Sequence, residues 1–268
     1  WREEAERLAE RLDAFIAGTN FRPLYDHAAR LFSLGHFPDR GRRDPILYDL
    51  LASEARMASF AAIALGQVSV AHWHALGRSL AEVGGRPMLL SWSGTMFEYL
   101  MPWLFMRTWR NTIWDSTYRA AVAGQLAHAR RHGVPLGVSE SGYYAFDEQM
   151  NYQYQAFGVP EIGFRKGMET DLVTAPYAAV LALPYAGKHA MEALRHFERL
   201  GARGRYGFYE AVDHTKRRLP EGRTHMVVTS YMAHHQGMSL LALANLLLPR
   251  TVVDRFHENK EVKAAELL

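Results

Sequence analysis

The chain has 268 residues, enough for one large domain or two small ones with a substantial core. Its hydrophobic fraction is 49% and its charged fraction 22%, values that indicate a globular protein and exclude intrinsic disorder. The net charge is only +3 with dispersed basic residues, which argues against nucleic-acid binding, and zero cysteines exclude disulfides and thiolate metal sites.

No apolar run reaches the ~20 residues that a membrane helix needs. The longest, from Met238 to Leu248, is short and contains Asn245. No signal peptide is visible. The chain opens with the charged amphipathic segment WREEAERLAERL, which begins in mid-element, so we expect a soluble domain excised from a larger protein.

Hydrophobic periodicity predicts helices in succession along the chain. The expected helices span 2–17, 45–65, 72–83, 95–107, 115–131, 170–183, 187–200, 207–216 and 225–248. Gly or Pro occurs in most joining segments, and we find no linker or internal repeat. The sequence therefore predicts a single all-α domain over residues 1–268. Helices this apolar must face neighbours on more than one side, which favours a toroid of helical hairpins over a four-helix bundle.

The helix expected over 45–65 carries an acidic residue on its apolar face. Asp44 and Pro45 form a good helix start, and leucines recur at helical spacing around Glu54. We therefore expect the Glu54 carboxylate to point inward, where a charge is costly unless it is paired, hydrogen-bonded or protonated. An ion pair with Arg56 or another arginine would make Glu54 structural, and a catalytic role would make it functional.

Three further carboxylates lie among aromatic residues. Glu98 follows Trp92 and Ser93 in LSWSGTMFEYL, Glu140 lies in GVSESG, and Glu210 lies in RYGFYEAVDH. Charge on apolar faces is otherwise rare. Together with Glu54, these residues are the set that a glycoside-processing site needs, two for bond cleavage and others to hold sugar hydroxyls.

The longest stretch with poor helical character spans residues 133–165. It combines Glu140, Asp147 and Glu148 with six of its seven aromatic residues, namely Tyr143, Tyr144, Phe146, Tyr152, Tyr154 and Phe157. Aromatic faces stack on the C–H faces of a pyranose, while carboxylates bind its hydroxyl groups. The aromatics could instead pack the loop down, but as a cluster they favour a sugar-binding surface.

Other chemistries have little support. His225, His234 and His235 do not have the spacing of a zinc motif, so no metal and no cofactor are expected. The polar AHHQG patch in the last helix still needs hydrogen-bond partners, either substrate hydroxyls or backbone carbonyls. Phosphate-binding glycine loops are missing, and WSG at 92–94 lacks the context of a serine hydrolase.

Several long strings together resemble the glycoamylase-like domain found in the middle of bacterial cyclic β-1,2-glucan synthases. They are FRPLYDHAARLFSLGH, YDLLASEARMASF, LSWSGTMFEYLMP, GVSESGYYAFD, RYGFYEAVD and YMAHHQGMSLLALANLLL, in order from about Phe21 to Leu268. The resemblance implies an (α/α)6 toroid related to the β-1,2-glucanases. A complete toroid of six hairpins usually needs more than 268 residues, so we expect helices that precede Trp1 to be absent from this chain.

The resemblance also implies an activity. A linear β-1,2-glucan is cut and its end rejoined by transglycosylation, in a parent with glucosyltransferase and phosphorylase-like domains on either side. That parent would be anchored at the cytoplasmic side of the bacterial inner membrane. An endo-β-1,2-glucanase of the same fold and a non-catalytic glucan-binding domain are the alternatives.

The family's catalytic pair corresponds to Glu54 in ASEAR and Glu140 in VSESG. Retention normally uses one carboxylate as nucleophile and another as acid and base, about 5 to 5.5 Å apart. The expected burial of Glu54 suits it to the acid role, and Glu140 between two serines in a loop suits the nucleophile. The assignment is open, because a proton passed through a substrate hydroxyl would let the acid lie farther away. The residues expected to bind substrate are Tyr48, Trp92, Ser93, Glu98, Tyr99, Tyr143, Asp147, Tyr152, Tyr154, Glu210, His235 and Gln236.

Overall fold

The computed structural model describes residues 1–248, 252–266 and 268. Helices, with short 3-10 turns included, make up about 47% of the chain. Thirteen strands of two to six residues lie among the described residues. The expected helical character is therefore confirmed, but the domain is not purely α-helical.

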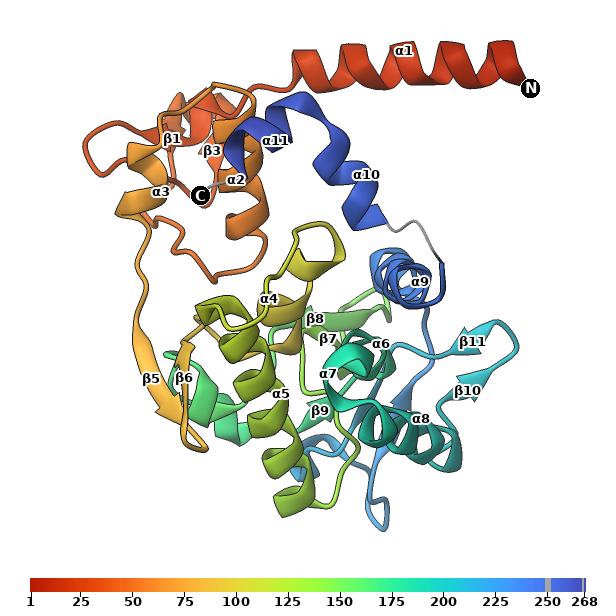
Figure 1. The fold of residues 1–268 in the computed structure, drawn as a ribbon. Coiled ribbons are helices and arrows are strands. Elements are labelled where there is room, and N and C mark those ends of the chain that lie inside the picture. Colours follow the sequence, from red (N-terminus) through yellow and green to blue (C-terminus); the bar gives the residue numbers. More distant parts are fainter. Residues whose placement is uncertain (249–251, 267) are drawn as a thin grey trace.

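The N-terminal segment forms one part of the molecule (Figure 1). Helix α1 (Arg2–Gly18) extends from it and buries none of its residues. The elements that follow are β1 (Tyr25–Asp26), β2 (Leu31–Phe32), β3 (His36–Phe37), β4 (Arg42–Arg43), α2 (Ala55–Ala64) and α3 (Ala71–Ala75). The chain returns to this part at its other end, where α10 (Val252–Glu258) leads into α11 (Lys260–Ala265) and α11 packs against α2.

The second part holds most of the helical core. A hairpin of β5 (Leu80–Val83) and β6 (Arg86–Leu89) packs against the long helix α5. The helices here are α4 (Met96–Leu100), α5 (Ile113–His132), α6 (Pro176–Leu181), α7 (Leu183–Ala186), α8 (Lys188–Arg199) and α9 (Ala233–Leu247). Helix α6 contacts α4, α8 and α9, and all six of its residues are buried. It is therefore a central element of this part.

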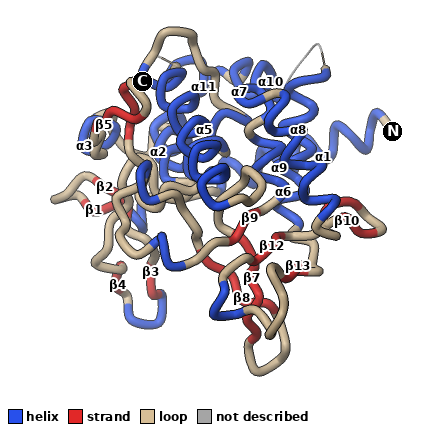
Figure 2. Tube along the Cα trace, turned by 90° about the horizontal axis from the view of Figure 1, so that it is seen from below, coloured by secondary structure: helices blue, strands red, loops and turns tan. Residues whose placement is uncertain are grey.

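Short strands gather below these helices. A bulged hairpin of β7 (Ser141–Phe146) and β8 (Tyr152–Gln155) lies beside a three-stranded antiparallel sheet in the order β13-β12-β9. Its members are β9 (Val173–Thr174), β12 (Ala211–Asp213) and β13 (Met226–Val228), while β10 (Arg203–Gly204) and β11 (Gly207–Phe208) form a separate hairpin. Figure 2 shows β7, β8, β9, β12 and β13 together on one side of the helices. This strand cluster carries half of the candidate site.

Local sequence signals explain the best-predicted helix. Helix α5 begins where the Thr112 side chain accepts a hydrogen bond from the Asp115 N–H, and it ends at Gly133 in the left-handed conformation, with φ of 68°. Both are common helix-end features. The predictions over 2–17, 115–131 and 187–200 are confirmed by α1, α5 and α8. The 3-10 turns are Arg22–Leu24, Pro38–Arg40, Pro102–Leu104, Pro160–Ile162, Met168–Thr170 and Lys216–Arg218.

Other expected helices are wrong in whole or in part. Residues 80–83 of the helix expected over 72–83 pair as a strand, as do residues 211–213 of the one over 207–216. The segments over 95–107, 170–183 and 225–248 are helical only in part. The stretch 133–165 lacks an α-helix, as expected, and its middle part, 141–155, forms an ordered hairpin. Strand pairing overrides helix propensity at 80–83, which pairs with the adjacent 86–89, and at 211–213, which pairs with 226–228 and 173–174. No single helix among the described ranges is both long and apolar enough to cross a membrane.

Candidate active site

Glu54 does not lie on a buried helical face. Helix α2 starts only at Ala55, and Glu54 occupies its N-cap position with an exposed side chain. The preceding Ser53 has a left-handed φ of 51°, and its hydroxyl donates to the Glu54 carboxylate. Asp44 accepts a hydrogen bond from the Ile46 N–H in a turn instead of capping a helix. The expected burial of Glu54, and the ion pair with Arg56, are therefore wrong.

Glu98 organises the backbone beside Glu54. Its side chain is 4% exposed and accepts hydrogen bonds from the Ser91 hydroxyl at 2.8 Å and the Ser93 N–H at 2.9 Å. It also accepts from the backbone of Thr95 and of Ser53, the neighbour of Glu54. Burial raises the pKa of Glu98, and these bonds oppose that rise. Glu98 is thus a structural acceptor for the loop that presents Glu54.

Two other predicted substrate contacts are also buried. Ser93 is 3% exposed, and Tyr99 is fully buried with its hydroxyl 2.5 Å from the Ile162 carbonyl oxygen. Their polar atoms are used inside the fold, so direct contact with a substrate is not expected for Ser93, Glu98 or Tyr99. Sequence periodicity placed them correctly in packed surroundings but could not distinguish a site from a hydrogen-bonded core.

Glu140 lies just before β7, in a half-buried position. The hydroxyl of Tyr177 on α6 lies 2.9 Å from its backbone carbonyl oxygen, which fixes the main chain. The Tyr154 hydroxyl donates to Glu140 Oε1 at 2.9 Å. Burial raises the pKa of Glu140, the Tyr154 hydrogen bond opposes the rise, and the negative charge of Glu54 adds to it.

The two predicted catalytic carboxylates therefore belong to one electrostatic cluster. Burial raises the pKa of Tyr48, and the charges of Glu54 and Glu140 raise it further. Burial also raises the pKa of Tyr154, and the charges of Glu140 and Glu54 raise it further. These groups come from the segment before α2, the start of β7 and strand β8, which the fold brings together.

A second group of polar residues adjoins Glu140. His235 Nε2 lies 3.3 Å from the Tyr154 hydroxyl, and His235 Nδ1 lies 2.9 Å and 3.0 Å from the two carboxylate oxygens of Glu210. His235 and Glu210 are 1% and 2% exposed. Both were expected to bind substrate directly. In the structure they are buried, and their side chains contact each other, Tyr154 and the Gly142 backbone. Gln236 also points inward, donating to the Phe208 carbonyl at 3.2 Å.

The remaining predicted aromatics divide into packed and exposed residues. Tyr143 packs edge-on against Phe157 and lies under the Arg218 guanidinium, 4.8 Å from its ring centroid. Tyr152 stacks at an angle on Phe146, with its hydroxyl 3.2 Å from Thr229 Oγ1. Trp92 is 54% exposed. Its backbone N–H donates to the carbonyl oxygen of Leu51, three residues before Glu54, so the Trp92 backbone lies next to the segment that leads to Glu54.

Asp147 has a structural use. It lies in the turn between β7 and β8 and accepts hydrogen bonds from the Gln149 and Asn151 backbone N–H groups and from the Asn151 side chain. The Asn151 bonds lower its pKa. No hydrogen bond recorded for the described residues connects Asp147 with Glu140 or Tyr154, so its position explains a stable turn rather than a substrate contact.

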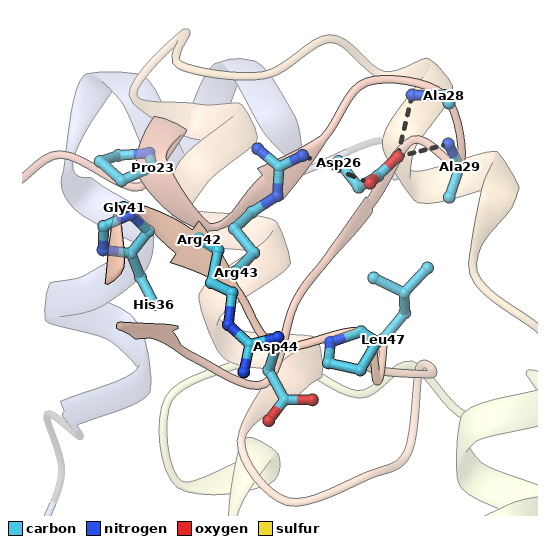
Figure 3. A pocket seen from close by; sticks show the side chains of 11 residues that line it. Pro23, Asp26, Ala28, Ala29, His36, Gly41, Arg42, Arg43, Asp44 and Leu47 are labelled. Atoms are coloured by element: carbon cyan, nitrogen blue, oxygen red, sulfur yellow. Dashed lines mark hydrogen bonds and ion pairs between the residues drawn. The ribbon is translucent and has the colours of Figure 1, made fainter. Parts of the chain in front are cut away.

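A separate hollow of about 660 Å³ lies beside β3 and β4 (Figure 3). Arg43 pairs with Asp26 at 3.4 Å there, and Asp26 also accepts the N–H groups of Ala28 and Ala29. None of the predicted site residues lines this hollow. The described residues contain no group of three or more His, Cys, Asp or Glu side chains placed to hold a metal ion.

The cluster contains two residues outside the predicted site set: Tyr177, which the sequence analysis did not consider, and His234, which it considered only as a possible metal ligand and as part of the AHHQG patch. Tyr177 lies on α6 with its ring stacked on His235, centroids 3.7 Å apart. His234 Nε2 lies 3.5 Å from the Tyr154 hydroxyl, and burial lowers its pKa. The apolar string TAPYAAV predicts an ordinary core position for Tyr177. Nothing in the sequence indicates that its ring stacks on His235.

Comparisons with known proteins identify the family of the chain. The chain is 42% identical over 261 residues to the cyclic beta-(1,2)-glucan synthase NdvB of Rhizobium meliloti, spanning 97% of this chain but 9% of that protein. The structure is similar to an endo-beta-1,2-glucanase from Chitinophaga pinensis, with a TM-score of 0.70, 17% identity, and coverage of 97% of this chain and 63% of that one. A putative glucoamylase from Bacteroides caccae gives a TM-score of 0.70 at 18% identity, covering 97% and 64%.

The two structural neighbours are below 25% identity and therefore support the fold alone. The sequence profile of the family described as putative glucoamylase matches residues 47–260, most of the chain and every candidate site residue. The resemblance recognised from the sequence strings is confirmed. The chain belongs to the glycoamylase family.

Proposed function

We propose that this chain is a transglycosylase that cleaves linear β-1,2-glucan and rejoins the ends to give cyclic β-1,2-glucan. The observation that carries the proposal is the electrostatic cluster of Glu54 and Glu140, two carboxylates from distant segments. The charge of Glu54 raises the pKa of Glu140, and both charges raise the pKa of Tyr48. The relatives, a cyclic glucan synthase and a β-1,2-glucanase by name, support the substrate class.

The environments of the two carboxylates favour the reverse of the roles expected from the sequence, which were Glu54 as the acid and Glu140 as the nucleophile. Glu140 is half-buried and burial raises its pKa, which suits an acid that must hold a proton before it protonates the leaving oxygen. Glu54 is exposed at the N-cap of α2, where a negative charge is favourable, which suits a nucleophile. We propose Glu140 as acid and base and Glu54 as nucleophile.

Retention of configuration follows from the product. The new bond is again β-linked, so the sugar configuration must be inverted twice, first by Glu54 and then by the attacking hydroxyl of the glucan end. Glu140 donates its proton in the first step and takes one from the acceptor in the second. Trp92, exposed near the Glu54 segment, is the aromatic face that we propose for stacking on a sugar ring.

The chain spans about 9% of the length of its synthase relative. We propose that it is one domain of a membrane-anchored parent, between a glucosyltransferase and a phosphorylase-like domain, and that its helices belong to an (α/α)6 toroid. An inverting endo-β-1,2-glucanase is the second candidate, supported by the fold of the Chitinophaga pinensis enzyme.

One experiment separates these functions. The chain is incubated with linear β-1,2-glucan, and the products are measured by mass spectrometry, with the Glu140→Gln variant and a linear β-1,3-glucan as controls. Products that lack one water relative to a linear chain of equal length support cyclisation. Shorter reducing chains support the hydrolase, and an unchanged substrate that still binds contradicts both enzymes.

A further inference from the structure

We propose that Tyr154 and His235 form a proton relay with Glu140, in which one proton is shared between the Glu140 carboxyl and the His235 imidazole. This inference deepens the proposed function and rests on it, because the relay has a catalytic use only if Glu140 acts as acid and base.

The relay is a continuous chain of contacts. Tyr154 Oη lies 2.9 Å from Glu140 Oε1 and 3.3 Å from His235 Nε2. His235 Nδ1 lies 2.9 Å from Glu210 Oε1. The tyrosine hydroxyl has one proton, so it donates either to Glu140 or to His235 but not to both at once.

Two arrangements of the protons satisfy every contact. In the first, protonated Glu140 donates to the Tyr154 oxygen, and the Tyr154 hydroxyl donates to Nε2 of neutral His235. In the second, the Glu140 carboxylate accepts from Tyr154, whose oxygen accepts the Nε2–H of a protonated His235. Conversion breaks the Glu140 O–H and the original Tyr154 O–H bonds and forms a new Tyr154 O–H and an Nε2–H bond. The number of protons is the same in both, and the Nδ1–H stays directed at Glu210.

Glu210 makes the second arrangement favourable. It is 2% exposed, and among the ion pairs formed by the described residues it pairs only with His235. A buried carboxylate needs a positive partner or several hydrogen bonds, and its other donor is the Gly142 N–H at 3.1 Å. A proton on His235 therefore compensates a charge that the fold has already buried.

Tyr177 fixes the positions of His235 and of the Glu140 backbone. Its ring lies flat on His235 at an interplanar angle of 12°, which prevents the imidazole from tilting away from Tyr154. Its hydroxyl lies 2.9 Å from the backbone carbonyl of Glu140. One side chain thus fixes both ends of the relay.

Other charges face the relay from neighbouring elements. The negative charge of Glu54, before α2, raises the pKa of Glu140, whereas the charge of His235 lowers it. His234, beside His235 on α9, lies 3.5 Å from the Tyr154 hydroxyl. Tyr48 faces both carboxylates. None of these groups is itself substituted in the Tyr154→Phe and Tyr152→Phe variants compared below.

The relay would serve both steps of the reaction. When Glu140 gives its proton to the departing sugar oxygen, the Tyr154 hydroxyl turns to donate to the new carboxylate. When the acceptor hydroxyl attacks, Glu140 takes its proton. The acceptor's proton restores the single proton that Glu140 and His235 share. Between turnovers this proton can move through Tyr154 to His235 and return to Glu140 before the next cleavage, without contact with bulk water.

The first test needs no substrate. Nuclear magnetic resonance follows the Glu140 carboxyl carbon and the His235 ring nitrogens through a pH titration of the whole chain. Both signals should change in the same two steps, as coupled groups do. Tyr154→Phe should reduce each to a separate single step. Tyr152→Phe removes a hydroxyl from the same strand, bonded to Thr229 instead of Glu140, and should keep the coupled titration.

The second test uses the pH dependence of the rate. The Tyr154 hydrogen bond and the His235 charge both lower the pKa of Glu140, so Tyr154→Phe or His235→Gln should move the alkaline limit of activity upward by at least about half a pH unit.

Two results would overturn the relay. One is independent titration of Glu140 and His235 in the unmodified chain, and the other is a rate loss that is uniform with pH in both variants. Coupled titration in a chain that leaves β-1,2-glucan unchanged would instead contradict the proposed function while keeping the relay. Tyr154 is 40% exposed, so the phenylalanine variant is expected to fold.

Discussion

The ring of Tyr177 lies flat against the imidazole of His235, with centroids 3.7 Å apart and planes at 12°. The tyrosine hydroxyl lies 2.8 Å from Ser139 Oγ and 2.9 Å from the carbonyl oxygen of Glu140. The segment just before β7, which carries one proposed catalytic carboxylate, is thereby attached to α6, and α6 packs against α9.

Tyr177→Phe should keep the stack and remove both hydroxyl contacts. The substitution leaves the Ser139 hydroxyl and the Glu140 carbonyl without this partner at a buried position. We therefore expect a loss of about 1 to 3 kcal/mol in the free energy of unfolding. Urea denaturation measures the loss, with Tyr209→Phe as a control outside this contact. An unchanged midpoint would show that the hydroxyl does not anchor Glu140.

Glu54→Gln and Glu140→Gln should each leave the fold intact and remove most glucan rearrangement. We expect rates to fall by about 10²-fold or more, since each carboxyl has a chemical role that an amide cannot fill. The rate on linear β-1,2-glucan is measured together with circular dichroism. Near-normal activity in either variant would contradict the catalytic assignment.

Glu140→Gln should also change how stability depends on pH. Burial raises the pKa of Glu140, so the folded chain binds this proton more tightly than the unfolded chain does, and stability falls as pH rises from about 4.5 through the folded pKa. The variant lacks the buried charge. Its melting temperature should exceed that of the unmodified chain at about pH 8 and match it at about pH 3.5.

The control for this measurement is Glu148→Gln, an exposed glutamate in the neighbouring turn, which should follow the unmodified chain at every pH. A lower melting temperature for Glu140→Gln at about pH 8 would indicate that the carboxylate is stabilised in the fold, which is the opposite of the expected effect of burial.

Trp92→Ala and Tyr143→Ala should have different effects. Trp92 is 54% exposed, so its loss should weaken glucan binding by about 1 to 3 kcal/mol, on the scale of base stacking, with little change in stability. Tyr143 packs on Phe157, so its loss should lower stability by about 2 to 4 kcal/mol. Calorimetry with long β-1,2-glucan and thermal melts separate the two, and a Trp92 variant with normal affinity would remove that residue from the site.

Glu98→Gln should weaken the hydrogen bonds that hold the backbone beside Glu54, although Glu98 itself is not proposed to contact substrate. An amide has one acceptor oxygen where the carboxylate serves the Ser91 hydroxyl and the backbone N–H of Ser93 and Ser53. We expect a loss of about 1 to 3 kcal/mol in the free energy of unfolding and a slower reaction. Glu82→Gln, outside this network, serves as the control. Full stability in Glu98→Gln would show that the loop holds itself without this acceptor.

The sequence by itself determined the helices whose signals are local and the identity of the family. Helix α5 has a cap at each end, and α8 has a strong apolar stripe, so neither depends on distant partners for recognition. The strings around Glu54, Glu140 and Glu210 carried the family resemblance, because they hold many residues in a fixed order.

The tertiary structure alone decided which polar residues share a site. Periodicity reports which face of a segment is buried, but it does not say which distant segment covers that face. It placed Glu54 in a helix that starts only after it, and it treated Glu98 and Glu210 as equivalent acids. The tertiary structure distinguishes the two acids. Glu98 is hydrogen-bonded by its own loop, whereas Glu210 contacts His235 of α9. The contacts among Tyr154, Tyr177 and His235 arise from long-range packing of a strand and two helices, which no local pattern encodes.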